Sequence, residues 1–342
     1  MKLTEEQLRA VALGAVRMPI EDGNLRFYRF SEAEDAFYNE RNTSFHDRSL
    51  CCAGVKLLFK TNSETLGLVA ETEKRSSRTY FSFDVTVNGA YLGSLSNFSE
   101  ETLPVDYTVE NYPLGRFEKE FSLGAGEKTV AVYFPALVRV TDFALTLADG
   151  ASLIPIKPVK RLLVYGDSIT QGYDARYPAR RYAMRLAEAL DAEEINKAIG
   201  GEIFCPRLAE LSDEDSIDYI TVAYGTNDWS ATSGERFLSD AKAFYSALSG
   251  RYPDAKIFAI TPIWRANTDE AKPFGPFESV KEKLALAVQG LENVTLIDGI
   301  DLVPHDTALF ADLRLHPRDE GFDLYAENLI GKIKAYLEGC DA

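Results

Sequence analysis

Cysteine and histidine are scarce in this 342-residue sequence, and basic residues are outnumbered by acidic ones. The four cysteines, Cys51, Cys52, Cys205 and Cys340, have neither zinc-binding nor redox spacing, so we expect free thiols and no metal site. No apolar run is long enough to span a bilayer. The formal net charge of −16 disfavours nucleic acid and anionic membrane surfaces as partners, because both would repel the protein.

The N-terminus also lacks the apolar segment of a secretory signal, which leads us to expect a cytoplasmic protein. Residues 4–16 instead have the pattern of a short amphipathic helix that begins with a Thr4 and Gln7 capping pair. An apolar content of 46% is ordinary for a globular protein, and the length favours two domains. Nothing in the composition implies a cofactor, and a homo-oligomer remains open.

Residues up to about 150 are β-rich, with short runs of alternating polarity. Asn88-Gly89 follows one such run and indicates a two-residue hairpin turn. Several strands with turns between them predict a β-sandwich, of jelly-roll type, within a domain at 1–155. Prolines at 155 and 158 favour an extended linker over residues 153–158. The clearest strand candidates are residues 55–61, 79–87, 117–121 and 128–134.

Strands alternate with helices from about residue 160, which predicts an α/β domain at 156–342. This alternation is typical of a five-stranded parallel sheet with helices on both sides. The strands are expected near 161–165, 194–199, 219–224, 256–261 and 294–298, and the helices near 178–190, 234–250, 276–289 and 319–337.

Ser168 follows the first strand of this domain, within the sequence Gly166-Asp167-Ser168-Ile169-Thr170. Parallel strands point their carboxyl ends at the ligand crevice of an open sheet, so Ser168 is a candidate nucleophile. An isolated serine at such a place is more often a helix N-cap. We expect Asp167 to bind backbone N–H groups rather than to transfer protons.

Three later segments favour the nucleophile over the helix N-cap as the role of Ser168. They are Asn196-Lys197-Ala198-Ile199-Gly200-Gly201, Gly225-Thr226-Asn227-Asp228 and Leu315-His316-Pro317. With the Ser168 segment, in this order, they resemble the four signature blocks of the SGNH, or GDSL, hydrolase superfamily of esterases and lipases. The resemblance covers roughly residues 160–337 and implies a flavodoxin-like SGNH fold. The β-sandwich ahead of it makes the layout similar to that of two-domain carbohydrate acetylesterases.

The resemblance implies that Ser168 is the nucleophile and His316 its general base. The backbone N–H of Ser168, together with Gly201 and Asn227, would form the oxyanion hole. The chemistry agrees, because a serine hydroxyl needs an imidazole to take its proton. Preorganised donors at a developing oxyanion supply roughly 3 to 4 kcal/mol each.

The acid of the triad departs from the family pattern. The family's aspartate stands three residues before the histidine, where this chain has Leu313, while Asp312 lies one residue further back. A one-residue bulge would bring Asp312 to His316. The alternatives are a Ser–His dyad with a backbone carbonyl, or another acid such as Asp298 or Asp319.

Trp229, Trp264 and Arg265 also follow strand ends, and we predict that they bind substrate as pocket walls. A tryptophan is by default a packing residue, which is the competing interpretation.

These features predict a serine esterase that works through an acyl-enzyme and removes acetyl groups from sugars or oligosaccharides. One alternative is a lipase, thioesterase or arylesterase on small acyl esters. Another is a carbohydrate-binding or scaffold protein with a decayed hydrolase domain, which the displaced aspartate would favour. The sequence leaves open the sugar or alcohol, the acyl group, the role of the N-terminal domain and the oligomeric state.

Overall fold

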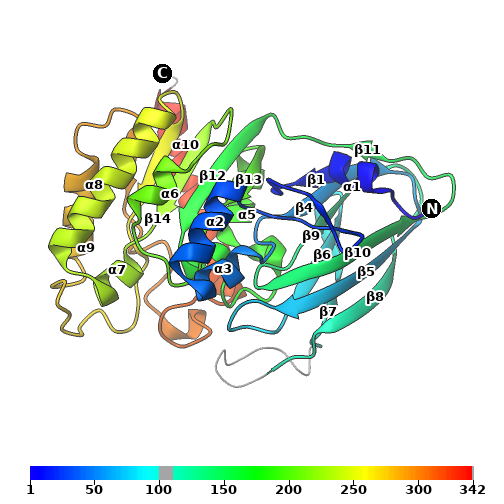
Figure 1. The fold of residues 1–342 in the computed structure, drawn as a ribbon, viewed down its shortest axis with the longest axis horizontal. Helices are drawn as coiled ribbons and strands as arrows, with labels where there is room; N and C mark the ends of the chain where they lie inside the picture. Colours follow the sequence, from blue (N-terminus) through cyan, green and yellow to red (C-terminus); the bar gives the residue numbers. More distant parts are fainter. Residues whose placement is uncertain (100–110, 341–342) are drawn as a thin grey trace.

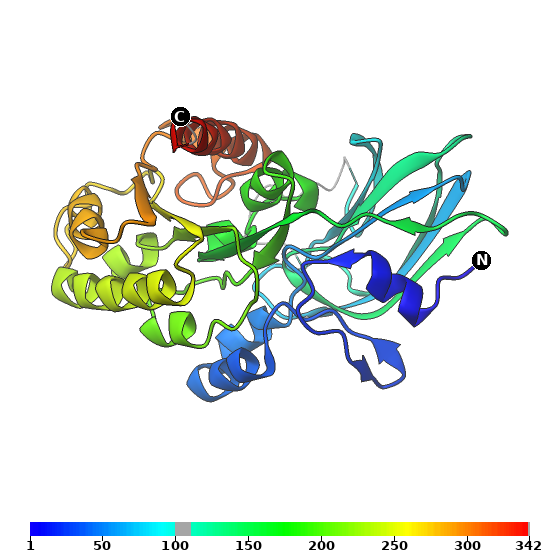
Figure 2. The same ribbon diagram turned by 90° about the horizontal axis from the view of Figure 1, so that it is seen from above.

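A computed structural model describes residues 1–99 and 111–340 of the chain. A β-rich part built mainly from the first half of the sequence lies beside an α/β part built from the second half (Figures 1 and 2). Within these residues, no helix has both the length and the apolarity needed to cross a membrane.

The β-rich part is a sandwich of antiparallel sheets. Apolar side chains from both sheets, including Phe59, Phe83, Leu66 and Leu145, form one buried core. This confirms the predicted sandwich, while jelly-roll connectivity stays a prediction. The strands of one sheet have the order β1 (Ala12–Leu13), β4 (Lys56–Thr61), β9 (Lys128–Tyr133), β6 (Ser82–Val87) and β7 (Ala90–Ser96). The strands of the other sheet have the order β10 (Val138–Leu147), β5 (Thr65–Lys74) and β8 (Gly115–Ser122). A separate small hairpin consists of β2 (Ile20–Glu21) and β3 (Asn24–Leu25).

Two local predictions in this part have different outcomes. Asn88 and Gly89 connect β6 to β7 with φ angles of 51° and 81°, and Val87 pairs with Ala90, so the two-residue turn is confirmed. The segment expected to be only a linker is extended, but it also contains β11 (Ile154–Pro155), which pairs with β4. This segment is therefore part of the sandwich edge, where a proline is tolerated.

The second half contains the five predicted parallel strands, with bounds close to those expected. Their order in the sheet is β13 (Ala192–Asn196), β12 (Lys160–Gly166), β14 (Tyr219–Ala223), β15 (Lys256–Ile260) and β16 (Val294–Ile297). Successive β12 side chains pack on opposite faces, Leu163 and Tyr165 on one and Leu162 and Val164 on the other.

Helices cover both faces of this sheet, as predicted. α6 (Pro206–Glu210), α8 (Gly234–Arg251) and α9 (Ser279–Val288) share a core with Leu163 and Tyr165. α5 (Tyr182–Ala189) and α10 (Asp319–Cys340) share the other core with Leu162 and Val164. The short helices α4 (Ser168–Gln171) and α7 (Thr226–Ala231) begin just past the carboxyl ends of β12 and β14.

Two helices that the sequence analysis did not predict follow the first helix, α1 (Glu5–Val11), within the β-rich half. These are α2 (Glu32–Arg41) and α3 (Thr43–Ser49), and α2 begins with a capping box formed by Ser31 and Glu34. Tyr38 of α2 is fully buried in the core that contains α6 and α8. The first half of the chain therefore supplies helices to the α/β part, and a boundary at residue 155 stays a prediction.

We expect the burial of Tyr38 of α2 to stabilise the α/β core. Tyr38→Ala should therefore lower the free energy of unfolding by about 3 to 5 kcal/mol, as other truncations of large core side chains do. Urea unfolding followed by far-UV circular dichroism measures the change. Tyr91→Ala is the control, because that ring is 58% exposed and its loss should cost less than about 1 kcal/mol. Equal losses in the two variants would contradict the assignment.

Candidate active site

Ser168 is the first residue of α4, directly past the end of β12. Asp167 caps this helix by accepting a hydrogen bond from the Ile169 N–H at 3.0 Å, as the sequence led us to expect. Gly166 is needed for close approach, since a Cβ there would lie 2.1 Å from Thr170 Oγ1. The turn thus presents the Ser168 hydroxyl at the carboxyl edge of the sheet.

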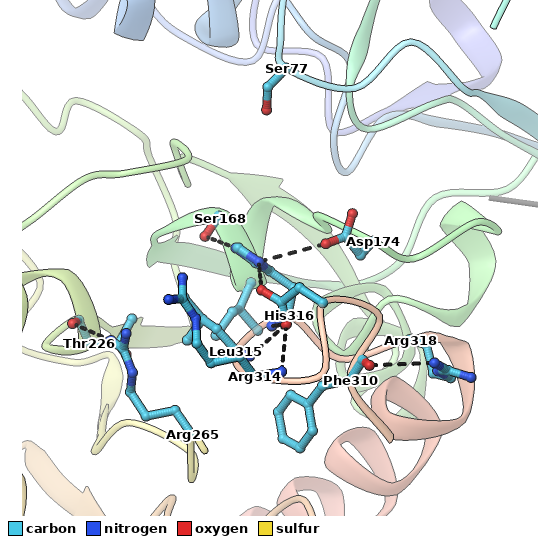
Figure 3. A network of polar contacts seen from close by, with 12 residues as sticks. Ser77, Ser168, Asp174, Thr226, Arg265, Phe310, Arg314, Leu315, His316 and Arg318 are labelled. Carbon is cyan, nitrogen blue, oxygen red and sulfur yellow. Dashed lines mark hydrogen bonds and ion pairs between the residues drawn. The ribbon is translucent and has the colours of Figure 1, made fainter. Parts of the chain in front are cut away.

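His316 meets Ser168 from the loop before α10 (Figure 3). Its Nε2 lies 2.8 Å from Ser168 Oγ, and its Nδ1 lies 2.9 Å from Asp312 Oδ2. The Asp312 Oδ1 atom accepts hydrogen bonds from the N–H groups of Arg314, Leu315 and His316. These bonds orient the carboxylate, which in turn orients the imidazole.

The shifted position of Asp312 is accommodated by the backbone of the next residue. Leu313 has a φ of 54°, the left-handed conformation, so the chain turns back within one residue. The other acids considered are engaged elsewhere: Asp298 binds Lys281 and Asp319 binds Arg176. Of the alternatives left open by the sequence, the structure places Asp312 beside the imidazole.

The pKa of Asp312 lies well below its ordinary value. Burial alone would raise this pKa, but the hydrogen bond from His316, the charge of His316 and the backbone N–H donors outweigh it. The carboxylate is therefore ionised at neutral pH and can stabilise an imidazolium.

The predicted oxyanion donors other than Ser168 follow β13 and β14, the two strands that flank β12. Gly201 follows β13 with a φ of 87°, where a residue with a side chain would be strained. Asn227 lies in the first turn of α7 and donates one amide hydrogen to the Glu202 carbonyl oxygen at 3.0 Å, which leaves its second amide hydrogen for substrate. Among the described residues, the N–H groups of Ser168 and Gly201 have no acceptor in the protein. These are the donors that an oxyanion requires.

Residues from the N-terminal helices hold the loop that carries Gly201, which sequence reasoning missed. Arg48 of α3 donates to the Gly200 carbonyl oxygen at 2.8 Å, and Gln171 of α4 accepts from the Gly200 N–H at 2.8 Å. Arg41 of α2 binds both carboxylate oxygens of Glu202 at 2.7 Å. No local motif in the sequence links these arginines to the loop, because the contacts span more than 150 residues.

Two of the three predicted substrate-binding residues are structural instead. Trp229 is fully buried, donates to the Gly275 carbonyl oxygen at 2.9 Å and packs edge-on against Phe277, so it is no pocket wall. Arg265 is 4% exposed and donates to the Thr226 carbonyl and hydroxyl oxygens. It therefore anchors α7, the helix that carries Asn227, rather than reaching substrate.

Trp264 does line a cavity, but one separate from the Ser168 hydroxyl. The cavity has a volume of about 750 Å³ and lies at the carboxyl ends of β15 and β16. One face of the Trp264 ring is stacked on His305 at 5.1 Å between centroids. Neither Ser168 nor His316 lines this cavity, so contact between Trp264 and the reacting ester stays a prediction.

An acidic trio elsewhere, Glu34, Asp213 and Glu214, has ligand atoms close enough together to hold a metal ion. The Lys197 ammonium group, however, binds Glu34 at 2.5 Å and Glu214 at 2.9 Å. The cluster is therefore an ion-pair network in which a lysine supplies the positive charge.

The sequence comparisons agree with this geometry. Residues 164–324 match the model of the GDSL-like Lipase/Acylhydrolase family. This match covers most of the α/β part and includes Ser168, Gly201, Asn227 and His316. The match and the geometry together identify an ester hydrolase. No curated protein matches the sequence significantly.

Solved structures share the arrangement of the GDSL domain with its β-sandwich. A salicylyl-acyltransferase from a tetracycline biosynthetic pathway has a TM-score of 0.78 at 20% identity, over 95% of this chain and 94% of its own. A GDSL-like lipase from Bacteroides ovatus has a TM-score of 0.76 at 19% identity, over 99% and 98%. An acetyl xylan esterase from Butyrivibrio proteoclasticus has a TM-score of 0.62 at 14% identity, over 99% and 98%. At these identities the likeness shows a common fold.

We expect Asp312→Asn to lower kcat for ester hydrolysis by up to about four powers of ten, because an amide favours the wrong imidazole tautomer. Steady-state kinetics with p-nitrophenyl acetate measures the loss. Asp298→Asn is the control, since Asp298 binds Lys281, and it should retain nearly full activity. A loss smaller than about tenfold in Asp312→Asn would show that the backbone orients His316.

Asp228, next to Asn227, should make stability depend on pH. Burial raises its pKa to about 7, against about 3.9 in an unfolded chain. The folded state thus retains a proton that the unfolded state loses, and stability should fall as pH rises from about 4 through 7. Relative to Asp228→Asn, the wild type should lose on the order of 2 kcal/mol between pH 5 and 8 in urea unfolding.

The control for this measurement is Asp215→Asn, because the Asp215 side chain is 93% exposed. Its stability should follow the wild-type pH profile. An Asp228→Asn profile parallel to the wild type would show that the raised pKa does not contribute to stability.

Proposed function

We propose that this protein is a serine esterase that deacetylates sugars or oligosaccharides through an acyl-enzyme. The observation that carries the mechanism is the chain of contacts from Ser168 Oγ to His316 Nε2 at 2.8 Å and from His316 Nδ1 to Asp312 at 2.9 Å. Such a chain is what a serine hydroxyl needs to act as a nucleophile near neutral pH.

In the acylation step, His316 Nε2 accepts the proton of Ser168 Oγ while this oxygen bonds to the ester carbonyl carbon. The carbonyl oxygen becomes an oxyanion that the N–H groups of Ser168 and Gly201 and the Asn227 amide stabilise. The imidazolium then donates its proton to the leaving alcohol oxygen as the carbon–oxygen bond breaks. An acylated Ser168 and a free alcohol result.

Deacylation repeats these steps with water. His316 Nε2 takes one proton from the water molecule, whose oxygen attacks the acyl carbon, and then returns that proton to Ser168 Oγ. The bond between Ser168 Oγ and the acyl carbon breaks, so the serine is regenerated and acetic acid leaves, which ionises to acetate in solution. The ionised Asp312 stabilises the imidazolium in both halves of the reaction, which its lowered pKa supports.

The choice of acetylated carbohydrate rests on the two-domain layout shared with an acetyl xylan esterase along 99% of this chain. The layout supports the substrate class by analogy of fold. A cytoplasmic location, which remains part of the proposal, would limit the substrates to small acetylated sugars or imported oligosaccharides.

Acyl transfer to an alcohol other than water is a second candidate. It is favoured by the salicylyl-acyltransferase, which has a TM-score of 0.78 over 95% of this chain. The same acyl-enzyme serves both reactions, because the only difference is the group that attacks it. Product analysis with and without added alcohols or sugars distinguishes transfer from hydrolysis.

The proposal predicts that acetate is released from acetylated oligosaccharides and that Ser168→Ala lowers the rate by several powers of ten, because the triad acts as a unit. Acetate is measured across a panel of acetylated sugars, together with p-nitrophenyl esters of increasing chain length. Ser246→Ala, on the exposed face of α8, is the matched control and should behave as wild type.

The outcomes separate the candidates. A Ser168→Ala variant that keeps a tenth of the wild-type rate would overturn the nucleophile assignment. A preference for long acyl chains over acetyl would replace the acetylesterase proposal with a lipase. Binding of oligosaccharides without any turnover would indicate the decayed hydrolase domain.

A further inference from the structure

A second carboxylate faces the Nδ1 side of His316, besides that of Asp312. Asp174 lies in the loop after α4, and its Oδ2 atom is 3.6 Å from His316 Nδ1 (Figure 3). Its side chain is only 2% exposed. The Asp174 backbone has a φ of 69°, a conformation that a non-glycine residue rarely adopts, so the surrounding contacts must hold this acid in place.

The groups that hold Asp174 come from the β-sandwich. Arg78 donates from Nε to Asp174 Oδ1 at 2.6 Å and from Nη2 to Oδ2 at 2.9 Å, and the Tyr80 hydroxyl donates to Oδ1 at 3.0 Å. Both residues lie between β5 and β6, and each is 5% exposed. A buried bidentate ion pair therefore links the sandwich to the catalytic histidine.

The linkage continues through an aromatic ring. The Arg78 guanidinium lies over Tyr173 at 5.1 Å, and the Tyr173 ring lies 5.9 Å from the His316 ring. Arg78 is thus connected to His316 by two routes, through the carboxylate of Asp174 and through the ring of Tyr173. Neither Arg78 nor Asp174 belongs to the four motifs that reveal the GDSL domain.

The charges of Asp174 and Arg78 have opposite effects on the protonation of the His316 imidazole. A carboxylate this close to an imidazole stabilises the imidazolium form, and a guanidinium bound to that carboxylate opposes the effect. In a buried setting both influences are only weakly screened. An Asp174 paired with Arg78 therefore stabilises the transient imidazolium less strongly than an unpaired carboxylate would.

We propose that Asp174 is a positioning residue for His316, and that Arg78 and Tyr80 of the β-sandwich set how strongly it favours the protonated imidazole. This inference rests on the proposed serine esterase function. It assigns the sandwich a direct influence on the acid–base chemistry of the site, beyond shielding or substrate binding.

Other charged or titratable groups also approach His316, and they come from several elements. They are Asp312 from its own loop, Asp167 from the end of β12 and Tyr173 from the loop after α4, while Arg314 and Arg265 act on Asp312. All of these belong to the second half of the chain, so substituting Arg78 leaves them in place.

The test is the pH profile of kcat/KM for p-nitrophenyl acetate in Arg78→Met. Without the guanidinium, the Asp174 and His316 pair should hold its proton more tightly, and the acid limb should move up by about 1 pH unit. Arg78→Lys retains the charge and should leave the limb within about 0.3 unit of wild type. Asp174→Asn should move the limb in the opposite direction and lower kcat about tenfold.

Lys56→Met is the matched control, because Lys56 of β4 also forms an ion pair between the two halves, with Glu188 of α5 at 2.9 Å. That pair lies near Ala192, at the amino end of β13 and away from Ser168. Its loss should leave the acid limb unmoved. Acid limbs of Arg78→Met and Asp174→Asn that coincide with wild type would overturn the proposal, whatever the change in rate.

An NMR titration of His316 in the Ser168→Ala background gives a readout that needs no turnover, and with three histidines in the chain its signal is assignable. Arg78→Met should raise the midpoint, and an unmoved midpoint would refute the proposal. If Arg78→Met does not fold, Tyr80→Phe tests the same point, with a smaller upward shift expected. Shifted midpoints in a protein that hydrolyses no ester would reject the proposed function but retain this coupling.

Discussion

Parallel pairing of β12 with β13 and β14 is the constraint on which the active site depends. Gly166 pairs with Ala223, so β12 and β14 end at the same position along the sheet. The turns that follow these strands place Ser168 and Asn227 at the same edge of the sheet. The chain leaves β13 beside β12 and forms the loop that carries Gly201. Residues separated by 30 to 60 positions in sequence thus converge because strands in one parallel sheet end together.

Buried and partly buried arginines from the N-terminal half hold the loops around the site. Arg29 is fully buried and donates to the carbonyl oxygens of Cys51, Asn196 and Ala198, so it fastens the start of the Gly201 loop. Arg41 and Arg48 hold the same loop further on, and Arg78 holds Asp174. Burying a guanidinium is costly unless its donors are satisfied, and each of these finds carboxylate or carbonyl acceptors across the two halves. The N-terminal half is therefore a structural support of the candidate active site.

Local patterns succeeded where a residue's role depends on its immediate neighbours. The strand alternation, the hairpin at Asn88-Gly89 and the serine after β12 all follow from short-range periodicity and turn chemistry. Local patterns gave the wrong role where that role depends on which distant segment packs against the residue. Trp229 follows a strand end as a pocket residue would, yet the loop near Gly275 covers it. Helix α2 carried a readable capping signal in Ser31 and Glu34, but the β-rich composition around it obscured this signal.

The sequence by itself predicted the two-part architecture and the candidates for nucleophile, base and oxyanion donors, because these lie in contiguous segments with characteristic order. It narrowed the acid to a few aspartates without deciding among them. Only the tertiary structure decided that choice, since it depends on the left-handed backbone of Leu313, which turns Asp312 back toward the imidazole. Only the tertiary structure revealed Arg48, Arg78 and Asp174 around the site, because hydrogen bonds and ion pairs between distant segments leave no periodic signal in one chain.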